Sequence, residues 1–208
     1  MIPRPPLSAL DGERLPGIGH NLGPPLDGAF SWRRHAWKRA RAKLMPRLPL
    51  EVIRRRVRRA RQLGLEYPAY ASILMGTGRD IVGFMFTCDA LGLRLERSLL
   101  LSESVVAKLR AIERCETLLA TEGLMDPVPM AAEIAKAHAI SVRAGARLPG
   151  SDTVPWTVGR DAIQSALAPL KLPTDAVVMI GTRAHERTWA DAARMAKFLP
   201  ADRYFASA

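Results

Sequence analysis

Arginine and lysine side chains are concentrated in one short part of the chain. Residues 31–62 contain 13 of the 31 basic residues and one of the 20 acidic residues, so their net charge is 13 minus 1, or +12. The rest of the chain has 18 basic and 19 acidic residues, a net charge of −1, although the whole chain has a formal charge of +11. A positive charge that is so localised predicts a surface that attracts anions.

We expect this basic segment to bind nucleic acid, because contacts from arginine and lysine to phosphates supply most of the sequence-independent affinity. Two tryptophans lie among the cations, and indole rings can stack on unpaired bases. The sequence contains no motif that would choose between DNA and RNA. The predicted contact residues are Trp32, Arg33, Arg34, Trp37, Lys38, Arg39, Arg41, Lys43, Arg54, Arg55, Arg58 and Arg59.

Two other partners suit the same charge. A basic amphipathic helix can lie on an anionic membrane surface, although the apolar stripe here contains little Leu or Phe. The arginines could also pair with an acidic protein surface, either on a partner or on this chain, whose remainder holds 19 acidic residues.

Two loops in which an arginine stands within two residues of a Gly-Thr pair are candidate anion sites. Backbone N–H groups of glycine-rich turns and of helix N-termini can hold a phosphate. The candidate residues are Gly76, Thr77, Gly78 and Arg79 in the first loop, and Thr182, Arg183, His185 and Arg187 in the second. If the two loops converge, the alternative function is an enzyme or binding protein for a phosphorylated or nucleotide ligand.

No set of residues predicts a catalytic or metal site. The first loop lacks the ending of a Walker motif, and Trp189 stands where a zinc-binding HExxH motif needs its second histidine. Cys88 and Cys115 have no metal-ligand spacing, and we expect both to be reduced thiols. We therefore predict a binding protein rather than an enzyme, with no cofactor; an interaction protein without a ligand is a third possibility.

The N-terminal residues 1–30 are rich in proline and glycine, which predicts a flexible leader. The segment IGHNLGPPL, residues 18–26, resembles a leader found in uncharacterised alphaproteobacterial and phage-associated proteins. This resemblance covers nine residues. It implies a bacterial origin, and it implies nothing about the fold of the rest.

The basic segment itself predicts two helices separated by Pro46 and Pro49. Ser31 can cap the first helix, and the second begins at Pro49 or Leu50 and ends before Gly64. In the second helix the apolar residues Leu50, Ile53, Val57 and Ala60 recur at helical spacing, so the arginines occupy the other faces.

The remainder, residues 67–208, predicts a helix-dominated α+β domain with a few short strands. The pattern of residues 70–75 leaves helix and strand open. We expect strands at 81–88 and 176–180, and helices at 102–123, at 130–139, around 163–170 and at 189–199. The predicted organisation is a leader (1–30), a basic helical segment (31–66) and a globular domain (67–208).

The apolar runs are short. None approaches the roughly 20 residues that cross a bilayer, and the first residues lack the apolar core of a secretion signal. From the sequence we expect a cytoplasmic protein.

Overall fold

The computed structural model describes residues 48–93, 100–150 and 153–206. The chain divides into two units, residues 1–49 and 50–208, and all helices and strands named below belong to the second. The leader and the first basic helix lie outside the described residues and stay predictions. The second basic helix belongs to the same compact unit as the globular domain.

Five parallel strands form one sheet in the order β3-β2-β1-β4-β5. All residues of β1 and β4 are buried, as is usual for parallel strands that are covered on both faces. Between β1 and β4 the order along the sheet reverses relative to the order along the chain. The strands are β1 (Gly83–Thr87), β2 (Glu116–Glu122), β3 (Arg143–Leu148), β4 (Val177–Gly181) and β5 (Lys197–Pro200).

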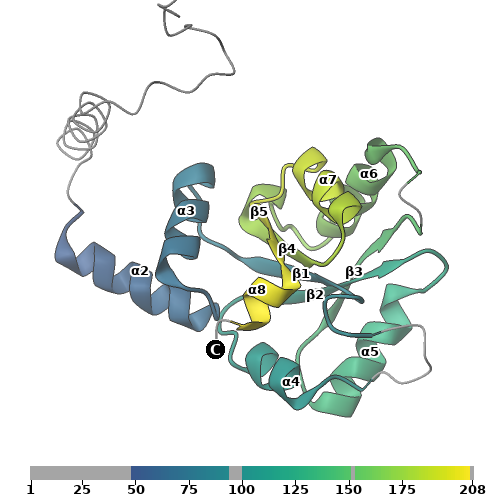
Figure 1. The fold of residues 1–208 in the computed structure, drawn as a ribbon, viewed down its shortest axis with the longest axis horizontal. Coiled ribbons are helices and arrows are strands. Elements are labelled where there is room, and N and C mark those ends of the chain that lie inside the picture. Colours follow the sequence, from purple (N-terminus) through teal and green to yellow (C-terminus); the bar gives the residue numbers. More distant parts are fainter. Residues whose placement is uncertain (1–47, 94–99, 151–152, 207–208) are drawn as a thin grey trace, which may run out of the picture. The chain divides into compact units, whose positions relative to one another are not determined.

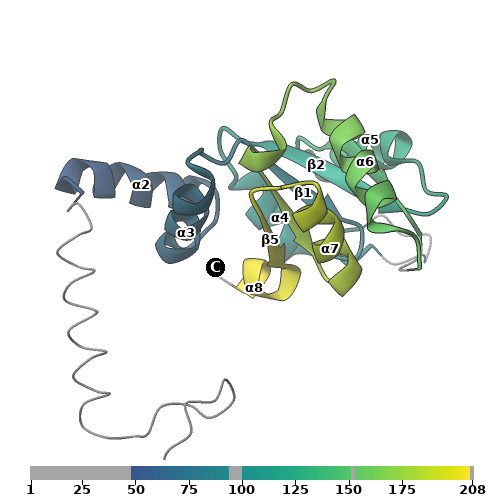
Figure 2. The same ribbon diagram turned by 90° about the horizontal axis from the view of Figure 1, so that it is seen from above.

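Helices cover both faces of the sheet (Figure 1). α6 and α7 lie on one face, and α4, α5 and α8 lie on the other. Figure 2 shows α2 beside α3 at one end of the domain. The helices are α2 (Leu50–Gln62), α3 (Tyr67–Thr77), α4 (Glu103–Arg110), α5 (Pro127–His138), α6 (Trp156–Leu167), α7 (Ala184–Ala192) and α8 (Ala201–Ala206).

Alternating side chains of the central strand divide the core between these two faces. Phe84 and Phe86 pack against Tyr204 of α8, with ring centroids 5.4 Å and 5.7 Å from its ring. Met85, between them in the sequence, belongs to the opposite core with Trp189 of α7. The domain therefore has three layers, with helices on either side of one sheet.

The expected class, a helix-dominated mixture of helices and short strands, is confirmed. The strands predicted at 81–88 and 176–180 and the helix ending before Gly64 are also confirmed. Gly64 has a φ of +63°, a conformation that glycine adopts easily. The segment 70–75 lies within the helix α3.

The helix predicted at 102–123 is wrong beyond Arg110. Ser102 does cap α4, since its Oγ accepts a hydrogen bond from the N–H of Val105 at 3.4 Å. The chain then turns at Arg114, where φ is +52°, and enters β2. β2 lies between β1 and β3 and is buried on both faces, so pairing with two strands outweighs the helical spacing of its apolar residues.

The helix predicted at 189–199 is also wrong in its second half. α7 ends at Ala192, Arg194 turns the chain with a φ of +58°, and the edge strand β5 follows. β3 was not predicted, because its alanines and glycine give little strand signal. A Cβ on Gly145 would lie 2.7 Å from the carbonyl oxygen of Leu119, so glycine is needed where β3 pairs irregularly with β2.

In the described part of the chain, none of the helices combines the length and apolar character needed to cross a membrane.

Candidate functional site

Four arginines are exposed along one side of α2. Helical spacing turns Ala60 inward, where it is 1% exposed, and Leu63 just after the helix is fully buried. The side chains three and four residues apart on the opposite side face solvent together. We call this surface the arginine face; it consists of Arg54, Arg55, Arg58 and Arg61.

Most of this positive charge is not neutralised within the described residues. Arg54 pairs with Glu51 at 2.7 Å, but both side chains are exposed, and such a pair contributes about 0–1 kcal/mol. Among the described residues no carboxylate lies within ion-pair distance of the other three arginines of the face. Arg54, Arg58 and Arg61 follow one another over about 10 Å of helix.

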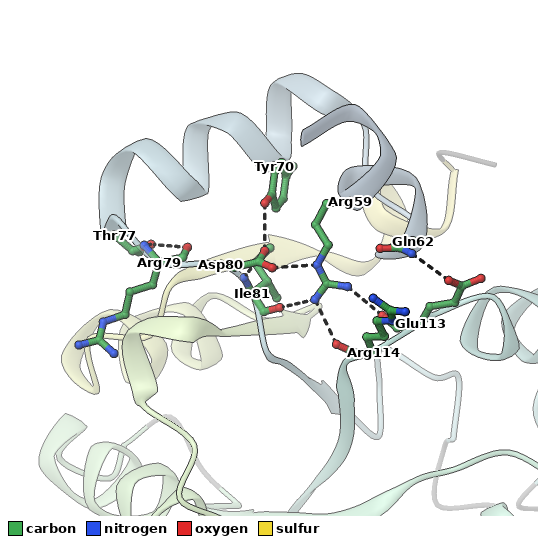
Figure 3. A network of polar contacts seen from close by, with 9 residues as sticks. All are labelled: Arg59, Gln62, Tyr70, Thr77, Arg79, Asp80, Ile81, Glu113 and Arg114. Atoms are coloured by element: carbon green, nitrogen blue, oxygen red, sulfur yellow. Dashed lines mark hydrogen bonds and ion pairs between the residues drawn. The ribbon is translucent and has the colours of Figure 1, made fainter. Parts of the chain in front are cut away.

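Arg59, although in the same helix, has a different role (Figure 3). Its guanidinium donates hydrogen bonds to Asp80 Oδ2 at 2.9 Å and to the carbonyl oxygens of Ile81, Glu113 and Arg114 at 2.8, 3.0 and 3.1 Å. The side chain is only 15% exposed. Arg59 therefore holds α2 against the domain, and the geometry does not present it to phosphates as the sequence analysis expected.

The other predicted contact residues, Trp32, Arg33, Arg34, Trp37, Lys38, Arg39, Arg41 and Lys43, lie outside the described residues. The structure thus places Arg54, Arg55 and Arg58 on one surface and adds Arg61 to it. The contacts expected in the first half of the segment stay a prediction.

The first Gly-Thr-Arg loop ends a helix rather than beginning one. Gly76 and Thr77 are the last residues of α3, and Gly78 caps it with its N–H donating to the carbonyl oxygen of Leu74. The N–H of Arg79 donates to Thr77 Oγ1 at 3.2 Å, and the Arg79 guanidinium pairs with Asp175 at 3.0 Å. The dipole of a helix disfavours an anion at this end, so the geometry does not favour the predicted anion site.

The second loop does precede a helix, but a carboxylate of the chain already occupies its donors. Glu186, which is fully buried, accepts hydrogen bonds through Oε2 from the N–H groups of Thr182 at 2.7 Å and Arg183 at 2.8 Å. Arg187 lies over the ring of Phe198 at 5.2 Å. The backbone groups that would hold a phosphate at the start of α7 therefore hold Glu186 instead.

The two loops also lie at opposite edges of the sheet. The first precedes β1 and the second follows β4, and these strands are parallel neighbours. The structure does not bring the loops together, so the expected convergence on one ligand has no geometric basis.

A polar cluster lies where β1, β2 and β4 end. Arg183 bridges Asp89 at 2.5 Å and Glu122 at 3.1 Å, and His185 Nε2 lies 3.7 Å from Glu122 Oε1. In doubly wound sheets this edge, at the reversal of strand order, is where ligands bind. With Glu186 the cluster contains three carboxylates against one guanidinium and one imidazole, a balance that does not attract phosphate.

Burial raises the pKa of the Glu122 carboxyl, Arg183 opposes this increase, and the nearby carboxylates of Glu186 and Asp89 add to it. Glu122 Oε1, His185 Nε2 and Glu186 Oε1 are buried without a hydrogen-bond partner among the described residues. These atoms could accept or share a proton. Sequence reasoning missed Glu122 because it placed this residue in a helix; the only available signal was the Thr-rich, apolar run of β2.

In the part of the chain that the structure describes, no group of three or more histidine, cysteine or acidic side chains is arranged to hold a metal ion. Burial raises the pKa of both cysteine thiols to about 12, which makes them poor nucleophiles.

No family model, no curated protein and no solved structure matches this chain.

Proposed function

We propose that this chain is a cytoplasmic nucleic-acid-associated protein, and that the arginine face of α2 contacts the phosphate backbone. The observation that supports this proposal is the set of exposed guanidiniums at Arg54, Arg58 and Arg61 on one side of a helix. Guanidinium groups at such spacing contact phosphates without reading base sequence.

The packing of α2 argues against its insertion into a membrane. An amphipathic helix binds a lipid surface through its apolar side. The inward positions Ala60 and Leu63 are at most 1% exposed because the rest of the domain covers them. At the C-terminal end of α2 a lipid surface could therefore meet only charged side chains, whereas Leu50 at the start of the helix is 59% exposed.

Pairing with the chain's own acidic residues explains Arg59, which bonds to Asp80, and in the described part of the chain it involves only Arg54 of the arginine face, through Glu51. Arg55, Arg58 and Arg61 have no acidic partner among the described residues. Their charge is therefore not balanced by a carboxylate within the described residues.

The experiment compares nucleic-acid binding of the full-length chain and two charge-reversed variants, using fluorescence anisotropy at low salt. The first variant is R54E/R55E/R58E, and we expect its affinity to fall at least about tenfold. The control is K136E/K171E/R194E, which changes the net charge equally at exposed positions away from α2. We expect the control to lose less than about threefold, through net charge alone.

Equal losses for the two variants would show that net charge rather than the arginine face governs binding. Wild-type affinity in the R54E/R55E/R58E variant would remove α2 from the contact surface. An absence of binding by the wild-type chain at low salt would contradict the proposed function itself.

A further inference from the structure

A hollow of about 570 Å³ lies next to the arginine face. It is bordered by the end of α2, by α4 and by α8, which lie close together in Figure 1. Arg61, the last member of the arginine face, forms part of its border, and Lys108 of α4 and Phe205 of α8 line it as well. Its volume is within the range of sites that hold small ligands. We call it the α4–α8 hollow.

The elements around this hollow are fixed to one another. The hydroxyl of Tyr204 donates a hydrogen bond to the carbonyl oxygen of Leu63 at 3.2 Å, which joins α8 to the end of α2. The ammonium of Lys108 bonds to the carbonyl oxygen of Tyr204 and lies 4.6 Å from the centre of its ring, which joins α4 to α8. The hollow is therefore a preformed feature of the folded domain.

Its lining combines an aromatic ring, aliphatic surface and positive charge. The ring of Phe205 packs edge-on against Tyr204, with centroids 5.2 Å apart, and Leu65 adds apolar surface. Two cations, Arg61 and Lys108, border the hollow with one carboxylate, that of Glu66. A flat apolar group attached to an anion fits this combination.

We propose that the α4–α8 hollow takes an unpaired base of a single-stranded nucleic acid, stacked on Phe205, while Arg61 and its neighbours on α2 hold the adjoining phosphates. This inference rests on the proposed function and deepens it, because it names single strands as the preferred substrate. Stacking on an aromatic ring tolerates any base, so the hollow adds affinity without sequence preference. In a duplex the bases are paired and stacked, and none can enter.

The test fills the hollow without changing charge. Ala107, an exposed residue of α4, borders the hollow, and leucine is well tolerated in helices. The A107L variant should bind a single-stranded oligonucleotide about tenfold more weakly than the wild-type chain, a loss of about 1.4 kcal/mol. Its binding to a duplex of the same length should change less than twofold. The control is A132L, the same replacement at an exposed position of α5, which should change neither affinity.

A second variant, F205L, keeps apolar bulk and removes the ring; it should also weaken single-strand binding selectively, with thermal unfolding recorded to verify the fold. DNA and RNA single strands form separate arms of the experiment. Equal effects of A107L on single strands and duplexes, no effect on either, or a wild-type preference for duplexes would overturn the inference. The R54E/R55E/R58E variant separates the two proposals, since it should weaken binding to both substrates whether or not the hollow takes a base.

Discussion

Replacing Arg59 by alanine should destabilise the domain, whereas replacing its neighbour Arg58 should not. Arg59 donates four hydrogen bonds that tie α2 to residues before β1 and β2 (Figure 3). Arg58 is exposed and has no acidic partner among the described residues. The two residues are adjacent in sequence and identical in chemistry, so their comparison isolates the network.

The expected magnitude follows from the partners that the alanine variant leaves behind. Three backbone carbonyl groups would lose a charged donor, and a hydrogen bond to a charged group contributes about 1.5–3 kcal/mol. These losses are not additive, and Asp80 is 47% exposed, so water can replace part of its ion pair. We expect R59A to lower the free energy of unfolding by about 2–4 kcal/mol, and R58A to change it by less than about 0.5 kcal/mol.

The assay is urea unfolding of the full chain followed by circular dichroism, with the free energy obtained by linear extrapolation. R59K is an informative third variant, because an ammonium keeps the charge but cannot reach all four acceptors. It should be intermediate between R59A and the wild type. Equal stability of R59A and R58A would refute the structural role of Arg59, as would full recovery by lysine, which would reduce that role to charge alone.

Three further predictions concern the core, the polar cluster and the thiols. G159A should lower the free energy of unfolding by at least about 2 kcal/mol, because the added Cβ would lie 2.3 Å from the Trp189 side chain. The control G76A adds a Cβ that has no atom within 4 Å, so in thermal unfolding it should be as stable as the wild type. Because the pKa of Glu122 is raised in the folded state, its contribution to stability is present below its unfolded pKa and is lost as pH rises through the folded value. E122Q should therefore gain stability relative to wild type as pH rises above the ordinary glutamate pKa of about 4.3, and a pH-independent difference between their melting temperatures would contradict this. Both thiols should react with a thiol reagent at pH 8 far more slowly in the native chain than in denaturant, since burial raises their pKa to about 12, and equal rates would disprove that burial protects them.

Helices and strands could be predicted from the sequence where the spacing of their apolar residues agrees with the side that the fold buries. Strand β1 shows this, because its short apolar run matches the burial of all its residues. Helix α2 shows it at its C-terminal end, where Ala60 is buried and Gly64 follows the helix. The prediction failed at β2. Its apolar residues have helical spacing, but the segment forms a buried strand that pairs with β1 on one side and β3 on the other. Pairing between distant strands leaves no local signal, so the strand order could not be predicted.

The candidate site divides in the same way. Exposure of Arg54, Arg55 and Arg58 follows from helical spacing and could be predicted. The inward role of Arg59 depends on carbonyl groups 22 to 55 residues away, and the sequence does not show that these converge. Predicting that Glu186 accepts hydrogen bonds at the N-terminus of α7 would require the first residue of that helix to be known. A carboxylate in a helix reaches back to the first N–H groups only from the right position in the first turn.

The most direct test of the central claim is the salt dependence of nucleic-acid affinity, measured for the full-length wild type and for R54E/R55E/R58E. Each phosphate contact releases counterions and steepens the fall of log K with log salt by about 0.7–0.9. If Arg54, Arg55 and Arg58 each contact a phosphate, the variant's slope should be shallower by about 2–3. Equal slopes for the two proteins would contradict the assignment of phosphate contacts to the arginine face.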